Sequence, residues 1–423
     1  MKVALQQTHS RLLFLGSCLL LGATYLTLCT REFLAFHYSH QPHLDSLQRA
    51  LTLEPANAEY WHLVGRYRMT VNQEPLAALP FLKHATELNP SRAQYWFDLA
   101  SDYQMLGIAD NENNAVEKAI AVDPSTPAVA WEAAGLFWTE GEADRALQEY
   151  RIVVENDPYL MGAALERCWR MRPDVNFLLA NVVPPRPDVY ATFLEFLMQK
   201  NEPAATAEVW KAIKRSHAQI STRYLFDYVR FLLDRKQTED AYQAWNDGAS
   251  LSELRAYQAS PENLFVNADF EFPILNTGFD WTYQDVAGVS LAVDSTGRFR
   301  GRPTLAAVLN SSGFADLGIH QLVPVQPHSE YEFSAWFKPD NIEGAGALHF
   351  VLEDRFDGTQ YFSSEDLSGH DAWTPVRGSF TTGPASTLLV LRIAHEPAET
   401  AIRGSVSIAG LKLVQQRTEA GAE

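Results

Sequence analysis

Cysteine is scarce in this sequence. The 423 residues hold three cysteines, Cys18, Cys29 and Cys168. Two of them lie in or beside an apolar stretch near the N-terminus, which leaves one for the rest of the chain. A disulfide framework and a cysteine metal cluster both need more thiols than this, so we expect neither after the apolar stretch.

Positive charge is scarce as well. There are 34 Lys and Arg against 52 Asp and Glu, a formal net charge of −18. From Pro261 onward the imbalance is steeper, with 10 basic and 21 acidic residues. Proteins that bind nucleic acids need a basic surface against the phosphates, so we predict no nucleic-acid partner.

Sequence signatures of catalysis are missing too. The chain has no G-x-S-x-G, H-E-x-x-H, Walker A or dinucleotide-binding glycine pattern. Glu353, Asp354 and Asp357 offer carboxylates for a glycosidase pair, but their clustering beside Gly358 favours a turn. We therefore expect no enzyme, no cofactor and no metal site.

An uncharged stretch, residues 12–30, lies between Arg11 and Arg31. As a helix it spans the hydrocarbon core of a bilayer, about 30 Å. We predict an uncleaved transmembrane anchor over 12–30, preceded by a short cytoplasmic N-terminus, residues 1–11. A cleaved signal peptide, a lipoprotein signal around residues 26–29 and a buried helix of a soluble protein are the alternatives.

Charge on either side of this stretch predicts its orientation. Lys2, Arg11 and the α-amino group precede it, whereas Glu32 follows Arg31 directly. The positive-inside rule then places the N-terminus in the cytoplasm. The expected location is the inner membrane, single-pass, with the bulk of the chain periplasmic or otherwise extracytoplasmic.

Four prolines recur every 34 or 35 residues, each after an acidic or amide residue. They are Pro55, Pro90, Pro124 and Pro158. Trp61, Trp96 and Trp131 follow the same period. Such a period predicts stacked helical hairpins, because one hairpin cannot bury its own apolar face. Large aromatic side chains at these positions are expected to be core.

Residues 41–160 resemble three tetratricopeptide repeats. The matching pattern is Trp, a small residue four positions later, small and aromatic residues on the second helix, and then Pro. Glu112 departs from it, because the family carries a small residue there. The resemblance implies a superhelical solenoid whose concave groove binds a protein partner. Residues 161–258 continue as degenerate helical repeats, with a rigid break at residues 183–187.

After Pro261 the pattern changes to short alternating runs separated by Gly, Pro, Asn and Asp. The clearest runs are residues 290–293, 304–309, 331–338, 347–353, 387–394 and 406–414. Alternation with period two is typical of half-buried strands. We predict a β-sandwich over residues 262–415, followed by a tail, residues 416–423. The fold class is thus an all-α solenoid followed by an all-β sandwich.

Five segments of this region resemble galactose-binding-like jelly rolls, the fold of several carbohydrate-binding modules. They are residues 264–271, 278–281, 320–325, 331–338 and 373–376. Many such modules hold a structural calcium with a late Asp, but residues 407–412 contain no carboxylate. We therefore predict no calcium, and Asn267 and Glu271 are expected to bond within turns and strands.

Strand alternation also suggests a binding face. Trp336 falls on the polar side of its strand, as do His349, Glu353 and Arg392 on theirs. If these strands are neighbours, the four side chains line one concave face that binds carbohydrate by aromatic stacking and hydrogen bonds. The alternative is that a loop covers Trp336 and that the polar residues are simply solvated.

These features predict a membrane-anchored extracytoplasmic scaffold. Its helical repeats bind protein, and it acts in bacterial envelope or exopolysaccharide assembly. The alternative is a carbohydrate-binding protein in which the jelly roll binds polysaccharide and the repeats are a spacer. A glycan-processing enzyme is the third hypothesis.

Overall fold

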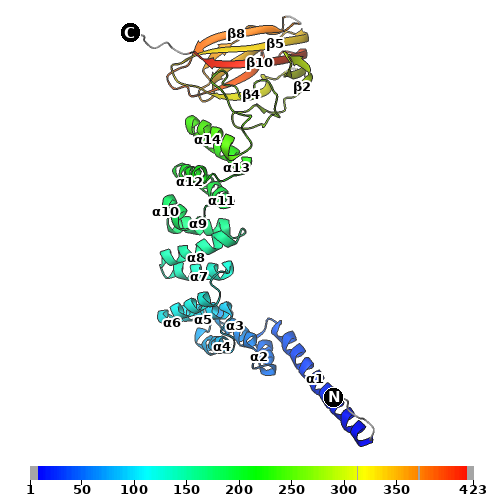
Figure 1. The fold of residues 1–423 in the computed structure, drawn as a ribbon, viewed down its shortest axis with the longest axis vertical. Helices are drawn as coiled ribbons and strands as arrows, with labels where there is room; N and C mark the ends of the chain where they lie inside the picture. The colour runs from blue at the N-terminus through cyan, green and yellow to red at the C-terminus, as the bar shows by residue number, and fades with distance from the viewer. Residues whose placement is uncertain (1–7, 312, 370–371, 417–423) are drawn as a thin grey trace. The chain divides into compact units, whose positions relative to one another are not determined.

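The computed structural model describes residues 8–311, 313–369 and 372–416. The chain divides into two compact units, Met1–Pro184 and Pro185–Glu423, and the division falls in the proline-rich segment 183–187. Helices make up the first unit. The second contains four more helices and two antiparallel sheets (Figure 1). A helical solenoid followed by a β-sandwich, as predicted, is confirmed.

The first helix, α1 (Thr8–Ser39), contains one segment, Arg11–Ser39, that is long and apolar enough to cross a membrane. A signal sequence near the N-terminus would meet the same criteria of length and composition. Within it, the hydroxyls of Ser17, Thr24 and Thr27 each donate to the carbonyl four residues earlier, at 2.8 Å. These bonds satisfy the hydroxyls inside the helix, so they do not interrupt its apolar character.

Antiparallel helix pairs follow in the first unit (Figure 1). The helices are α2 (Leu44–Leu53), α3 (Ala58–Thr70), α4 (Pro75–Leu88), α5 (Ala93–Leu106), α6 (Ala109–Val122), α7 (Pro127–Thr139), α8 (Ala143–Asn156), α9 (Met161–Met171) and α10 (Val175–Asn181). At Gly65 on α3 a Cβ would lie 2.8 Å from Leu82 of α4. The small residue lets the two helices of this hairpin approach closely.

The repeated proline marks the end of every second helix. The residues that precede the four prolines, Glu54, Asn89, Asp123 and Asp157, are the C-caps of α2, α4, α6 and α8. Proline cannot continue a helix, so each hairpin ends there. The indole of Trp61 donates to the Pro55 carbonyl at 2.7 Å, and Trp96 bonds Pro90 in the same way at 2.8 Å. At Trp61 and Trp96 the sequence period therefore corresponds to a hydrogen bond. The bond joins the helix that carries the indole to the proline turn before that helix.

Cationic side chains lie on these tryptophan rings. Lys118 lies 4.6 Å from the ring centre of Trp96, and Arg167 lies 4.0 Å from that of Trp131. Such contacts stabilise the stack by cation–π attraction. Trp61, Trp96 and Trp131 are each half-buried rather than part of the fully buried core, so the prediction that they are core is wrong. Their rings instead pack at the edge of the array against neighbouring side chains.

The second unit begins with two further hairpins. Their helices are α11 (Pro187–Gln199), α12 (Pro203–Ser216), α13 (Thr222–Leu233) and α14 (Thr238–Leu251). Ten strands follow: β1 (Thr282–Tyr283), β2 (Val289–Phe299), β3 (Arg302–Ser311), β4 (Asp316–Pro324), β5 (Glu330–Gly344), β6 (Ala347–Asp354), β7 (Gln360–Ser363), β8 (Thr374–Thr381), β9 (Leu388–Glu396) and β10 (Ile402–Gln415).

The strands form two five-stranded antiparallel sheets. Their orders are β1-β4-β9-β6-β7 and β2-β3-β10-β5-β8. The predicted inward residues are buried between them, including Phe333 and Phe337 of one sheet and Phe350 and Leu391 of the other. In-and-out alternation was therefore predicted correctly from the sequence. Asn267, expected to bond within a turn, bonds both backbone groups of Phe272.

The sandwich packs on the last helical hairpin. Trp245 of α14 is fully buried, lies edge-on to Phe279 at 6.0 Å, and donates to the Tyr257 carbonyl at 2.8 Å. Gly278, with φ +62°, lies so close that an added Cβ would be 2.3 Å from the Trp245 ring. The change in composition at Pro261 therefore separates two kinds of secondary structure within a single compact unit.

Candidate functional site

The structure separates the four residues predicted to share a face. Trp336 lies on β5, whereas His349 and Glu353 lie on β6 and Arg392 on β9. Strand β5 belongs to one sheet, and β6 and β9 are neighbours in the other. The prediction of one face lined by all four is wrong, because alternation tells which side of a strand a residue occupies but not which sheet the strand joins.

Glu353 and Arg392 do meet, on the outer face of their sheet. Arg392 donates from Nε and from an η nitrogen to the two carboxylate oxygens of Glu353, at 3.1 and 3.0 Å. His349 Nδ1 is 2.8 Å from the Ser364 carbonyl oxygen. Glu353 and Arg392 therefore bond to each other and His349 bonds to the backbone, which leaves Trp336 as the centre of a separate candidate site. A carbohydrate-binding role for the other three remains a prediction.

Trp336 lies in a hollow on the outer face of the β2-β3-β10-β5-β8 sheet. The hollow has a volume of about 510 Å³, within the range of small-ligand pockets. Trp336 is half-buried, with the Phe299 ring at 5.1 Å and the Arg300 guanidinium at 4.8 Å from its centre. Polar side chains line the rest of the hollow: Asp269, Arg302, Glu332, Ser334, Arg377 and Lys412.

Strand register arranges the polar residues beside the tryptophan. Ser334 on β5 is opposite Lys412 of β10 on one side and Arg377 of β8 on the other. Strands are about 4.8 Å apart, so the two cations flank a row about 10 Å wide. Trp336 is two residues further along β5, about 7 Å away. The site thus combines an aromatic ring with a row of hydrogen-bond donors.

A tight hairpin supplies the residues that sequence reasoning missed. Phe299 of β2 pairs with Arg302 of β3, and Arg300 and Gly301 between them have φ of 51° and 88°. Two consecutive positive φ values fit the type I′ hairpin turn. Arg302 pairs with Asp269 in the same hollow. The sequence signal that could have predicted this hairpin is the Arg300-Gly301 pair between two alternating runs.

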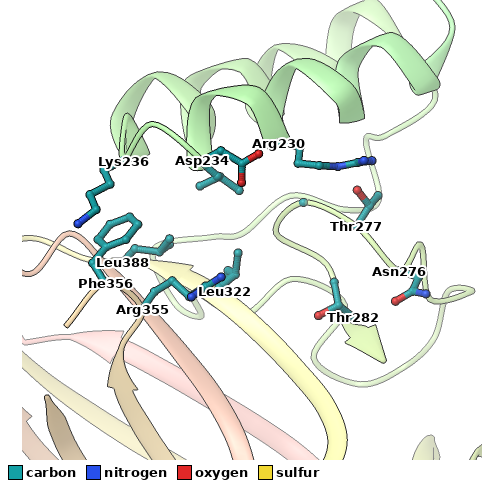
Figure 2. Close-up of a pocket in the computed structure, with 12 residues that line it drawn as sticks. Arg230, Asp234, Lys236, Asn276, Thr277, Thr282, Leu322, Arg355, Phe356 and Leu388 are labelled. Atoms are coloured by element: carbon teal, nitrogen blue, oxygen red, sulfur yellow. The ribbon is translucent and has the colours of Figure 1, made fainter. Parts of the chain in front are cut away.

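A second hollow, of about 430 Å³, lies between the α13–α14 hairpin and the sandwich (Figure 2). Its lining carries three cations, Arg230, Lys236 and Arg355, and one acid, Asp234. Apolar side chains such as Phe356 complete it, and Lys236 lies 5.2 Å from that ring. Its donors come from helix, loop and strand positions rather than from one row of paired strands beside the ring, so we take the Trp336 hollow as the candidate sugar site.

The repeats also contain buried acids, including Glu112, which departed from the repeat pattern. Glu112 is 5% exposed and accepts from the Gln104 amide at 2.7 Å. Burial, together with the neighbouring Glu112 carboxylate, raises the pKa of Glu140 to about 7. On α5, Asp102 is fully buried, and burial raises its pKa to about 6. Within the described residues, no cluster of His, Cys, Asp and Glu is suited to hold a metal ion.

Comparison with known proteins gives matches at the level of fold. The sequence matches no protein-family model, and it matches no curated protein. Among solved structures, the sandwich side is similar to a CBM4 module, with 18% identity over 36% of this chain and 99% of that one, and a TM-score of 0.28.

Two further structures extend the comparison. The CBM22-1 xylan-binding domain of Paenibacillus barcinonensis Xyn10C is 17% identical over 33% of this chain and 86% of its own, with a TM-score of 0.25. The pilF protein of Pseudomonas aeruginosa is 14% identical over 48% of this chain and 99% of its own, with a TM-score of 0.24. At such low identities and TM-scores these likenesses carry no argument about ligands or partners.

Proposed function

We propose that this protein is a membrane-anchored scaffold whose β-sandwich binds a polysaccharide in the Trp336 hollow. The observation that carries the proposal is a half-buried tryptophan on the outer face of a sheet, beside the row of Lys412, Ser334 and Arg377. Sugar rings bind by stacking on an aromatic ring while polar groups bond their hydroxyls. The hollow offers both.

Affinity electrophoresis of the purified full-length protein in detergent, through gels that contain polysaccharides, tests the proposal. Trp336→Ala is expected to abolish retardation, because it removes the stacking surface. Trp373→Ala is the matched control: its ring also packs on Phe299, at 4.6 Å, but it is absent from the lining of the hollow. Circular dichroism checks that both variants are folded. Equal retardation of wild type and a folded Trp336→Ala would overturn the proposal.

The anchor is proposed to be α1, with the N-terminus in the cytoplasm. The apolar segment Arg11–Ser39 and the positive charges of Lys2 and Arg11 support this arrangement. Resistance to carbonate extraction, together with protease accessibility of the bulk of the chain from the outer side, is the expected result. A soluble, shortened product would indicate a cleaved signal peptide instead.

The helical hairpins are proposed to bind a protein partner. Together with a glycan-binding sandwich, they suit a bacterial envelope or exopolysaccharide assembly, where protein and polymer must be held at one membrane. Support for this part is the helical hairpins of each unit, from α3 to α8 in the first and from α11 to α14 in the second. Site-specific photo-crosslinking from exposed positions of α3, α5 and α7 in cells tests it, and crosslinks confined to lipid or absent altogether would contradict it.

A further inference from the structure

We propose that the polysaccharide bound in the Trp336 hollow is acidic, so that its carboxylate or similar anionic groups pair with the cations of this sheet face. This inference rests on the proposed function, because it names the class of glycan that the same site takes.

Charge is distributed unevenly over the chain after Pro261. That part has 10 basic and 21 acidic residues. Four of the bases line the hollow, Arg300, Arg302, Arg377 and Lys412, against two of the acids, Asp269 and Glu332. A surface drawn at random from this composition would be acidic. The hollow instead has a formal charge of +2 within a protein of −18.

The four cations are not equally available to a ligand. Arg302 pairs with Asp269 and lies 3.8 Å from Glu271, and Arg300 lies on the Phe299 and Trp336 rings. By contrast, neither Arg377 nor Lys412 forms an ion pair with a carboxylate in the part of the chain that the structure describes. Lys412 attracts the Glu262 carboxylate without forming an ion pair with it, so no close ion pair neutralises either charge before an anionic ligand binds.

Position makes these two cations suited to a charged sugar. They face each other across Ser334, and Trp336 lies about 7 Å from that row. A sugar ring stacked on Trp336 would place the substituents of an adjoining ring between a guanidinium and an ammonium. A hydroxyl and a carboxylate can both accept hydrogen bonds from these cations, but only the carboxylate adds the Coulomb attraction of opposite charges, so the row favours anionic over neutral rings.

The alternative occupants are neutral glycans, because stacking on Trp336 does not by itself distinguish neutral from charged sugar rings. The hydroxyls of a neutral chain would accept hydrogen bonds from Lys412 and Arg377, but a neutral chain would leave the two positive charges uncompensated. In a hollow for neutral sugars we would expect uncharged amide and hydroxyl side chains in this row. Ser334 is the one uncharged residue among the three.

Binding of the full-length protein to matched pairs of polymers tests the inference. Alginate, polygalacturonate and hyaluronate are each compared with their carboxyl-reduced counterparts, which keep the backbone and lose the charge. We expect at least one acidic polymer to bind about tenfold or more tightly than its reduced form, with an affinity that falls as salt rises.

Two single-charge variants on the same strand localise the effect. Lys412→Gln is expected to weaken binding of the acidic polymer about tenfold and to weaken any binding of the reduced polymer much less, because the Gln amide still donates a hydrogen bond to a hydroxyl but carries no charge. Arg403→Gln removes one exposed positive charge from β10 outside the hollow and should behave as wild type.

The outcomes separate the inference from the function on which it rests. Equal or tighter binding of the reduced polymers would overturn the acidic assignment and leave polysaccharide binding standing. Equal losses in Lys412→Gln and Arg403→Gln would show a general charge effect and would also overturn it. Failure to bind any polymer, acidic, reduced or neutral, would remove the proposed function and this inference together.

Discussion

Asp102 is a buried carboxylate whose pH dependence can be worked out from the structure. It is fully buried on α5, and neither carboxylate oxygen has a hydrogen-bond partner among the described residues. Burial raises its pKa from 3.8 to about 6, because a charged group loses its hydration there. Folding therefore disfavours the ionised form, and Asp102 destabilises the fold wherever it is charged.

The magnitude follows from linkage between protonation and folding. A shift of about 2 pKa units corresponds to about 3 kcal/mol at about 1.4 kcal/mol per unit. Below pH 3.8 both states are protonated, and no destabilisation remains. It grows as the pH rises from 3.8 and is complete above about pH 6. Asp102→Asn cannot ionise, so the variant should lack this loss of stability.

The measurement is urea unfolding of the full-length protein, equilibrated at several pH values. After equilibration, a short hydrogen-exchange pulse at one fixed pH labels the unfolded molecules, and the label is read in peptides of α5 and α6. The stability of Asp102→Asn relative to wild type should rise by about 2–3 kcal/mol between about pH 4 and pH 8. Glu132→Gln, an exposed carboxylate on α7, is the control and should show no such change. Parallel pH profiles for Asp102→Asn and wild type would refute the reasoning.

Two further predictions concern packing and a second buried acid. Gly278→Ala should destabilise the second unit by about 2 kcal/mol more than the control Gly358→Ala. Both glycines have positive φ, but only at Gly278 would an added Cβ meet Trp245. Equal losses of melting temperature in the two variants would contradict this. Glu140→Gln should stabilise the first unit above about pH 7 and not below pH 4.5, because burial beside Glu112 raises the pKa of Glu140 to about 7. Thermal melts at pH 4 and pH 8 test it, and a pH-independent shift would exclude it.

Local sequence was enough to predict the helical half. Asn or Asp before proline ends a helix through backbone chemistry that needs no distant partner, and the C-caps at Asn89 and Asp123 confirm it. The role of Trp96 was less accessible. Its spacing from Pro90 was visible in the sequence, but the hydrogen bond that explains the spacing became visible only in three dimensions.

The departures from the repeat pattern had no local explanation. Glu112 was visible as an irregularity in the sequence, but its neighbour Gln104 lies on α5 and its neighbour Glu140 is the C-cap of α7. Side chains that meet across a hairpin or between repeats depend on how the helices pack. Their energetics therefore cannot be predicted from spacing along one helix.

The sandwich shows where prediction from local pattern stops. Alternation along β5, β6 and β9 correctly separated inward from outward side chains, because a strand has two faces whatever its neighbours are. Which strands are neighbours depends on long-range pairing. Tertiary structure alone decided that Trp336 belongs with Lys412 and Arg377, and that Glu353 and Arg392 bond to each other in the opposite sheet.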